Sequence, residues 1–205
     1  MAVLEGIQIQ NYRSLRDVTL GKTFEKQSSD ALPRLMAVIG ANGVGKSTLL
    51  DALGFLGDCL NDGVEAACDK PQRGGFERLR TQGVQEPIRF EVRFRQTLKD
   101  RPISYSLHID QDARGRVCVV YERLRQRRKG QSNGRPYSFL ELRDGEGYAW
   151  SGEESEINEG VRKTEIRMSD RQVLGIATLG TLKDHPRIGQ FRSFLAGWYL
   201  SYFVP

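Results

Sequence analysis

The chain has 205 residues and a formal net charge of +5, with 31 lysines and arginines against 26 aspartates and glutamates. This length suits one substantial domain, and the charge favours anionic partners without demonstrating one. The three cysteines lack CxxC spacing, which disfavours a disulfide framework and a zinc site. No apolar run reaches the ~18 residues of a membrane span, and the first residues lack a signal-peptide pattern, so a cytoplasmic protein is expected.

Residues 1–60 carry the strongest pattern. The stretch LEGIQIQNYRSLRDVTL, which starts at Leu4, predicts two short strands around a turn, and the polar residues 21–34 predict a surface loop. The continuous apolar run LMAVI, residues 35–39, then predicts a strand buried on both faces of a central sheet. Leucines at steps of three and four predict a helix whose apolar stripe faces that sheet: Leu49, Leu53, Leu56 and Leu60.

Between this strand and this helix stands GANGVGKST, residues 40–48, which fits the phosphate-loop pattern G-x-x-x-x-G-K-[ST]. Its glycines let successive backbone N–H groups point at phosphate oxygens, and the helix adds its positive dipole end. Lys46 is expected to reach the β- and γ-phosphates as the catalytic lysine, and the Ser47 hydroxyl to bind Mg²⁺. The predicted ATP-binding residues in this loop are Gly40, Asn42, Gly43, Val44, Gly45, Lys46, Ser47 and Thr48.

Residues 88–168 change to a period of two. Apolar residues alternate with polar ones from Ile88 onward, and four such segments predict strands of an antiparallel sheet beside the nucleotide core. A basic loop lies between the third and fourth segments. Its run RLRQRRKG, residues 123–130, suits either a contact to a DNA backbone or a solvated hairpin tip.

Residues 169–205 predict two helices. Ser169 and Asp170 are suitable N-cap residues for the first helix, and the sequence DHP at residues 184–186 ends it. The second helix carries an apolar, largely aromatic stripe, which is expected to be uncovered in this chain and to need another segment over it. Its members are Ile188, Phe191, Phe194, Leu195, Trp198, Tyr199 and Tyr202.

The two opening motifs, IQIQNYRSLRDVTL and VIGANGVGKSTLLDAL, resemble the N-terminal lobe of ABC-type ATPases of the SMC, RecF and OLD group, and more narrowly the bacterial AAA-family ATPases of that group. The resemblance is specific in the first sixty residues and loose along the rest. It implies an α/β fold in which one ATP-binding lobe covers residues 1–205. That lobe has a P-loop NTPase core sheet with flanking helices in residues 1–60, an antiparallel β subdomain in 88–168 and a helical tail in 169–205.

The resemblance also assigns roles to residues outside the loop. An N-[FY]-R element, here Asn11, Tyr12 and Arg13, touches the nucleotide in that family, which makes Arg13 the candidate ATP contact. The alternative for Arg13 is an ordinary solvent-facing arginine at a turn. Gln172 is the best-placed candidate for the family's glutamine that contacts Mg²⁺, and its alternative is a residue at a helix start without a functional role.

Hydrolysis in such enzymes needs an apolar strand that ends in Asp-Glu. The aspartate binds Mg²⁺, and the glutamate polarises the attacking water. The segment VCVVYE ends in Glu122 without the aspartate, and the family's L-S-x-G-[EQ] signature is absent from the sequence. The resemblance places both elements in a C-terminal lobe. The chain is therefore expected to contain half of a catalytic site.

Three functions fit these observations. The first is an ATPase lobe that binds ATP and Mg²⁺ and, with its missing lobe, hydrolyses ATP across a head-to-tail homodimer. The resemblance implies that this reaction is coupled to DNA or to a partner nuclease, in genome maintenance or anti-phage defence. The second is a self-contained P-loop phosphotransferase such as a small kinase. The third is a nucleotide-binding interaction module without turnover.

Overall fold

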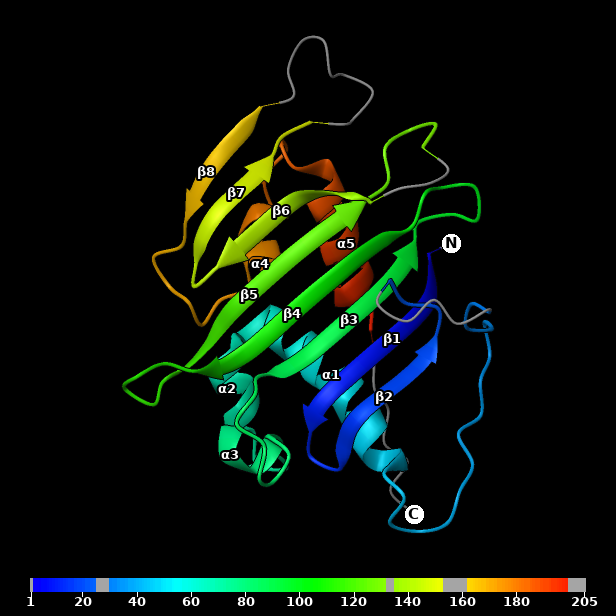
Figure 1. Ribbon diagram of the computed structural model, residues 1–205, viewed down its shortest axis with the longest axis vertical. Helices are drawn as coiled ribbons and strands as arrows, with labels where there is room; N and C mark the ends of the chain where they lie inside the picture. Colours follow the sequence, from blue (N-terminus) through cyan, green and yellow to red (C-terminus); the bar gives the residue numbers. More distant parts are fainter. Residues whose placement is uncertain (1, 25–29, 132–134, 153–161, 199–205) are drawn as a thin grey trace.

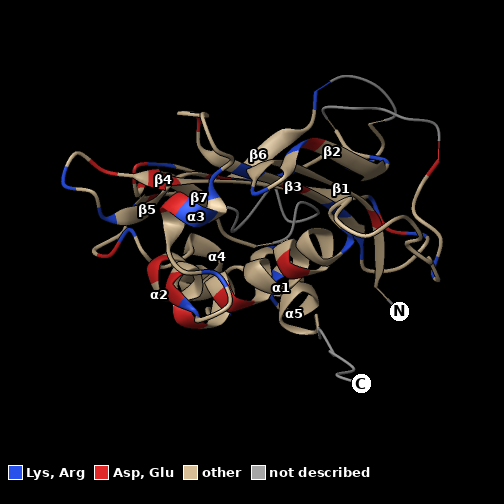
Figure 2. Cartoon of the chain, turned by 90° about the horizontal axis from the view of Figure 1, so that it is seen from below, with Lys and Arg blue, Asp and Glu red and all other residues tan. Residues whose placement is uncertain are grey.

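The computed structural model describes residues 2–24, 30–131, 135–152 and 162–198. They form an α/β fold of two layers, in which the helices pack against one face of an eight-stranded sheet (Figure 1, Figure 2). Neighbouring strands are antiparallel throughout, in the order β2-β1-β3-β4-β5-β6-β7-β8. The strands are β1 (Val3–Tyr12), β2 (Leu15–Gly21), β3 (Ile88–Arg95), β4 (Ile103–Gln111), β5 (Val117–Gln126), β6 (Tyr137–Arg143), β7 (Glu146–Trp150) and β8 (Lys163–Arg167).

The four strands expected from residue 88 are confirmed as β3 to β6, because their alternating residues place one apolar face toward the helices. Two further strands, β7 and β8, extend the sheet beyond that prediction. The opening strand pair is also part of this sheet, since β1 pairs with β3 in a register that sets Ile9 opposite Phe90. The later strands therefore continue the sheet that β1 and β2 begin.

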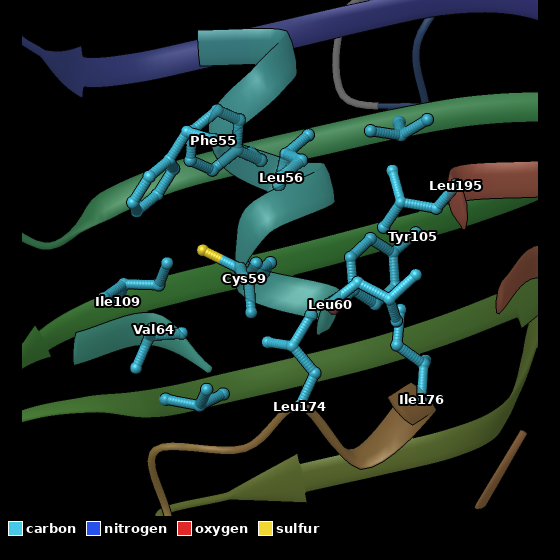
Figure 3. Close-up of a cluster of buried hydrophobic side chains, with 14 of the residues drawn as sticks. Phe55, Leu56, Cys59, Leu60, Val64, Tyr105, Ile109, Leu174, Ile176 and Leu195 are labelled. Atoms are coloured by element: carbon cyan, nitrogen blue, oxygen red, sulfur yellow. The ribbon is translucent and has the colours of Figure 1, made fainter. Parts of the chain in front are cut away.

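The helical layer is built around one long helix that crosses the sheet. This helix is α1 (Lys46–Asp62), and four shorter ones accompany it: α2 (Val64–Asp69), α3 (Phe76–Leu79), α4 (Gly175–Leu179) and α5 (Pro186–Ala196). The leucine stripe predicted for α1 faces the sheet, with Leu49, Leu56 and Leu60 buried. Buried side chains of α1 form one apolar cluster with side chains of β4 and of the C-terminal segment (Figure 3). Its labelled members are Phe55, Leu56, Cys59 and Leu60 of α1, Tyr105 and Ile109 of β4, and Leu174, Ile176 and Leu195.

The expectation that the last helix lacks a cover is wrong for its described part. Phe191 and Leu195 of α5 are fully buried. The Phe194 ring stacks on Phe94 of β3 with centroids 4.6 Å apart, and Phe191 lies 4.6 Å from the Tyr105 ring. The inner face of the sheet thus supplies the cover, while Tyr199 and Tyr202 of the predicted stripe lie outside the described residues.

The buried central strand expected at residues 35–39 is also wrong. These residues form no strand, and Leu35 and Ile39 are 89% and 91% exposed. A strand buried on both faces needs partner strands beside it and cover on both sides. In the described parts of the chain β1 already pairs with β2 and β3, and no strand is placed next to residues 35–39.

Candidate nucleotide-binding site

The phosphate-loop sequence occupies the turn that leads into the first residue of α1. Gly43 and Gly45 have φ angles of 82° and 97°, in the left-handed region where glycine carries little steric cost. The helix starts at Lys46 with no acidic residue in its first turn, so its N–H groups and dipole present positive potential at the loop. The glycine φ angles and the helix start therefore match the motif, while residues 35–39 do not form the strand expected before the loop.

The Lys46 side chain folds back over this loop. Its ammonium donates hydrogen bonds to the carbonyl oxygens of Gly40, at 2.7 Å, and Ala41, at 2.6 Å. These contacts hold the cation directly above the turn, where phosphate oxygens would compete with the two carbonyls. Ser47 is exposed beside it, and so are Asn42, Gly43 and Val44. The loop thus gathers the predicted phosphate-binding residues at one open end of α1.

The turn after β1 lies against this loop. A Cβ atom added to Gly45 would lie 3.2 Å from the Ser14 hydroxyl and 3.5 Å from a Leu15 methyl group. Asn11 and Arg13 both adopt positive φ angles, of 61° and 50°, which bend the chain sharply at this point. The structure therefore places Ser14 and Leu15, which directly follow the N-Y-R element, against the phosphate loop.

The Arg13 side chain itself points to the body of α1. Its guanidinium lies 3.2 Å from the Asp51 carboxylate and donates to the Gln72 carbonyl at 2.7 Å. Arg13 is thus neither an ordinary solvent-facing residue nor, in this arrangement, directed at the phosphate loop. Its role as an ATP contact stays a prediction, which would require these hydrogen bonds to be exchanged for bonds to the nucleotide.

Sequence reasoning missed the buried charge network that supports this site. Asp51 is 4% exposed, accepts a hydrogen bond from the Tyr12 hydroxyl at 2.7 Å and pairs with Arg73 at 3.1 Å. Arg73 also binds Asp58 at 2.6 Å. Burial, followed by the Asp51 charge, raises the pKa of Tyr12, so its hydroxyl stays protonated and donates. One signal of this network in the sequence was Asp51, an acidic residue next to the buried apolar stripe of α1.

Gln172, the candidate Mg²⁺ contact, lies at the opposite end of α1. The amide nitrogen of its side chain donates to Glu65 at 2.5 Å, and its backbone carbonyl accepts from the Val64 backbone N–H at 2.8 Å, just past the helix end. The 17 residues of α1 span about 25 Å, so Gln172 and Ser47 are far apart. The structure does not bring these two predicted Mg²⁺ ligands together.

Glu122 is similarly remote from catalysis in this arrangement. It is fully buried, and its carboxylate accepts hydrogen bonds from the backbone N–H groups of Gly175 and Ile176, at 2.6 and 3.0 Å, and from the Tyr105 hydroxyl at 3.0 Å. Burial raises its pKa, and these three donors oppose the rise. Glu122 therefore anchors α4 to the sheet. Among the described residues, no group of three or more His, Cys, Asp or Glu side chains could hold a metal ion.

Comparison with known proteins gives one match. A family model described as "AAA domain, putative AbiEii toxin, Type IV TA system" matches residues 35–197, which include the phosphate loop and most of the described sheet. No curated protein and no solved structure matches the chain. Within the described residues, no helix is both long enough and apolar enough to span a membrane.

Proposed function

Because the chain belongs to this family of AAA-type P-loop ATPase domains, we propose that it binds ATP and Mg²⁺ through residues 40–48, with Lys46 on the β- and γ-phosphates and Ser47 on the metal. The single observation that carries the proposal is the phosphate loop at the N-terminus of α1, with Lys46 held above it by two carbonyls. Fixed positive φ angles at Gly43 and Gly45 support the same role.

Hydrolysis in this proposal needs a second protein segment. The described residues offer no group of three or more His, Cys, Asp or Glu side chains that could hold a metal ion, and the buried acid of α1, Asp51, is already bonded to Tyr12, Arg13 and Arg73. The apolar run 35–39 leads directly into the loop and is exposed. A further strand, from the same polypeptide or another, would cover this run and bring the acidic residues that bind Mg²⁺ and polarise water.

The finer assignment follows the sequence resemblance to the SMC, RecF and OLD group. In that assignment two copies bind ATP head to tail, and the ATP cycle is coupled to DNA or to a partner nuclease. The family's description names a toxin of a type IV toxin–antitoxin system, which favours defence over genome maintenance as the biological setting.

The proposal is tested by ATP binding and by turnover measured separately. Binding of a fluorescent ATP analogue with Mg²⁺ should be lost in Lys46→Ala and weakened in Ser47→Ala. Arg114→Ala, a change at an exposed hairpin, is the matched control. The chain alone should bind ATP without turnover above the Lys46→Ala blank. Turnover well above that blank would overturn the two-segment site, and binding that survives Lys46→Ala would overturn the phosphate-loop assignment.

A further inference from the structure

The helices cover one face of the sheet, and no described helix lies on the other, open face of β3, β4 and β5 (Figure 2). Phe24 packs on part of that face, where Glu91, Ser104 and Arg125 are buried. The period of two that buries the apolar residues of these strands directs arginines to the open face. The strand registers set Arg93, Ser104 and Arg125 in one row across the three strands. A second row, four residues along β3, contains Arg89, His108 and Tyr121.

A hollow of about 380 Å³ lies at the first row. Seven lysine and arginine side chains line it, and Asp100 is the one acidic side chain in its described lining. Arg125 is one of the seven, and its guanidinium is held 3.6 Å from the centre of the Phe24 ring, with 6% of the side chain exposed. The other six come from four neighbouring segments and are Lys22, Arg93, Arg95, Lys99, Arg101 and Arg127.

Neighbouring acids neutralise part of this charge. Glu5 pairs with Arg93 at 2.8 Å and also with Arg95, and Glu91 lies 3.8 Å from Arg125. The described residues thus place seven basic and three acidic side chains around the hollow, with Asp100 as the third acid, which is an excess of four basic side chains. A concave surface with an excess of one charge sign concentrates ions of the opposite sign. The hollow therefore suits a ligand with several negative charges.

The second row adds aromatic surface. A further hollow of about 430 Å³ shares Arg125 with the first, and its lining includes Arg89, Arg123, His108 and Tyr121 together with two acids, Asp17 and Glu91. The rings of His108 and Tyr121 have centroids 4.9 Å apart. The two rows are separated by four residues of β3, or about 13 Å, which a single extended ligand can cover.

We propose that this open face binds single-stranded nucleic acid, with phosphates in the basic hollow and a base against Tyr121 and His108. Arginine and lysine neutralise backbone phosphates, and an aromatic ring accepts an unpaired base by stacking. The half-buried Tyr121 ring would exchange its contact with the Arg143 guanidinium, 4.9 Å from the ring centre, for that base. A duplex keeps its bases stacked inside and offers them no such contact, and an acidic protein segment has no base to offer. The binding face is separate from the phosphate loop, so this inference does not depend on the proposed ATP site.

The test is the binding of a fluorescently labelled, unstructured DNA strand of thymidines to the whole chain, followed by anisotropy at several salt concentrations. Lys22→Ala with Lys99→Ala removes two charges from the hollow. Arg78→Ala with Lys183→Ala removes two exposed charges from the helical layer and serves as the matched control. Thermal unfolding of each variant checks that it remains folded. Lys46→Ala separates this site from the ATP site and should bind the strand normally.

Removal of the two hollow lysines should weaken binding about tenfold and reduce the slope of log affinity against log salt by about 1.4, or 0.7 per lost phosphate contact. Tyr121→Ala should weaken binding about tenfold without changing that slope, because stacking releases no counterions. An equal loss in the control double variant would overturn the proposal. So would equal competition by a duplex of the same length or by polyglutamate.

Discussion

The Tyr12 hydroxyl donates a 2.7 Å hydrogen bond to Asp51, and this bond joins the end of β1 to the second turn of the helix that follows the phosphate loop. Both partners are buried, and Arg73 and Arg13 bind the same carboxylate at 3.1 and 3.2 Å. The loop is thus placed by a charged network beneath it as well as by its own glycines. Removal of a buried carboxylate that has three donors strongly lowers the free energy of unfolding, because the donors stay buried without an acceptor.

Asp51→Ala should therefore lower the free energy of unfolding by about 3 kcal/mol, because it leaves Arg73 and the Tyr12 hydroxyl buried without their shared acceptor. Urea denaturation followed by circular dichroism measures this change. Asp62→Ala is the control on the same helix, since Asp62 is 45% exposed in its pair with Lys70 and should cost less than about 1 kcal/mol. Equal losses in the two variants would show that the network does not support the loop.

Local patterns predicted most of the secondary structure. The alternation from Ile88 and the leucine stripe of α1 were sufficient for β3 to β6 and for the main helix, because burial on one face imposes those periods. The phosphate loop was equally readable, since its chemistry depends on a short run of consecutive residues.

Contacts between segments far apart in the chain could not be predicted from local sequence patterns. The run 35–39 has the composition of a buried strand, but composition does not say whether a partner strand is present beside it. The Tyr12–Asp51–Arg73 network and the cover of Phe191 by Tyr105 each join residues far apart in the chain. Gln172 had a suitable residue type, yet the fold places it at the wrong end of α1.

The two left-handed glycines of the phosphate loop make different steric demands. Gly45→Ala should destabilise the chain more than Gly43→Ala, because both changes place a side chain at positive φ but only the first meets neighbours, Ser14 and Leu15. The backbone cost alone is about 1–2 kcal/mol in each case. Thermal unfolding of the two variants gives the difference. Identical losses would mean that the turn after β1 does not pack against the loop in solution.

The exposed run 35–39 offers a test of the two-segment catalytic site. Leu35→Ser and Ile39→Ser should change the free energy of unfolding of this chain by less than about 0.5 kcal/mol, since both side chains are about nine-tenths exposed. In the presence of the segment that completes the site, the same changes should reduce ATP turnover while ATP binding by the chain is kept. Leu98→Ser, at an exposed position of the β3–β4 loop, is the control. Unchanged turnover would show that nothing packs on this run.

Glu122 predicts a particular dependence of stability on pH. Burial raises its pKa above the ordinary value of 4.5, so the folded chain binds this proton more tightly than the unfolded chain. Its contribution to stability is fully present below about pH 4.5 and is lost as pH rises through the raised pKa. Relative to Glu122→Gln, which stays neutral, the wild-type chain should lose at most about 1.4 kcal/mol per pH unit across that window.

The glutamine variant has a constant penalty of its own, because its amide nitrogen must face one of the two backbone donors, Gly175 or Ile176. That penalty does not vary with pH, so the informative quantity is the change in the difference between the two proteins, measured by urea unfolding from pH 4 to pH 8. Glu77→Gln, whose side chain is 65% exposed, corrects for the loss of a surface carboxyl. A difference that stays flat across this range would mean that Glu122 is no harder to ionise in the folded chain than in the unfolded one.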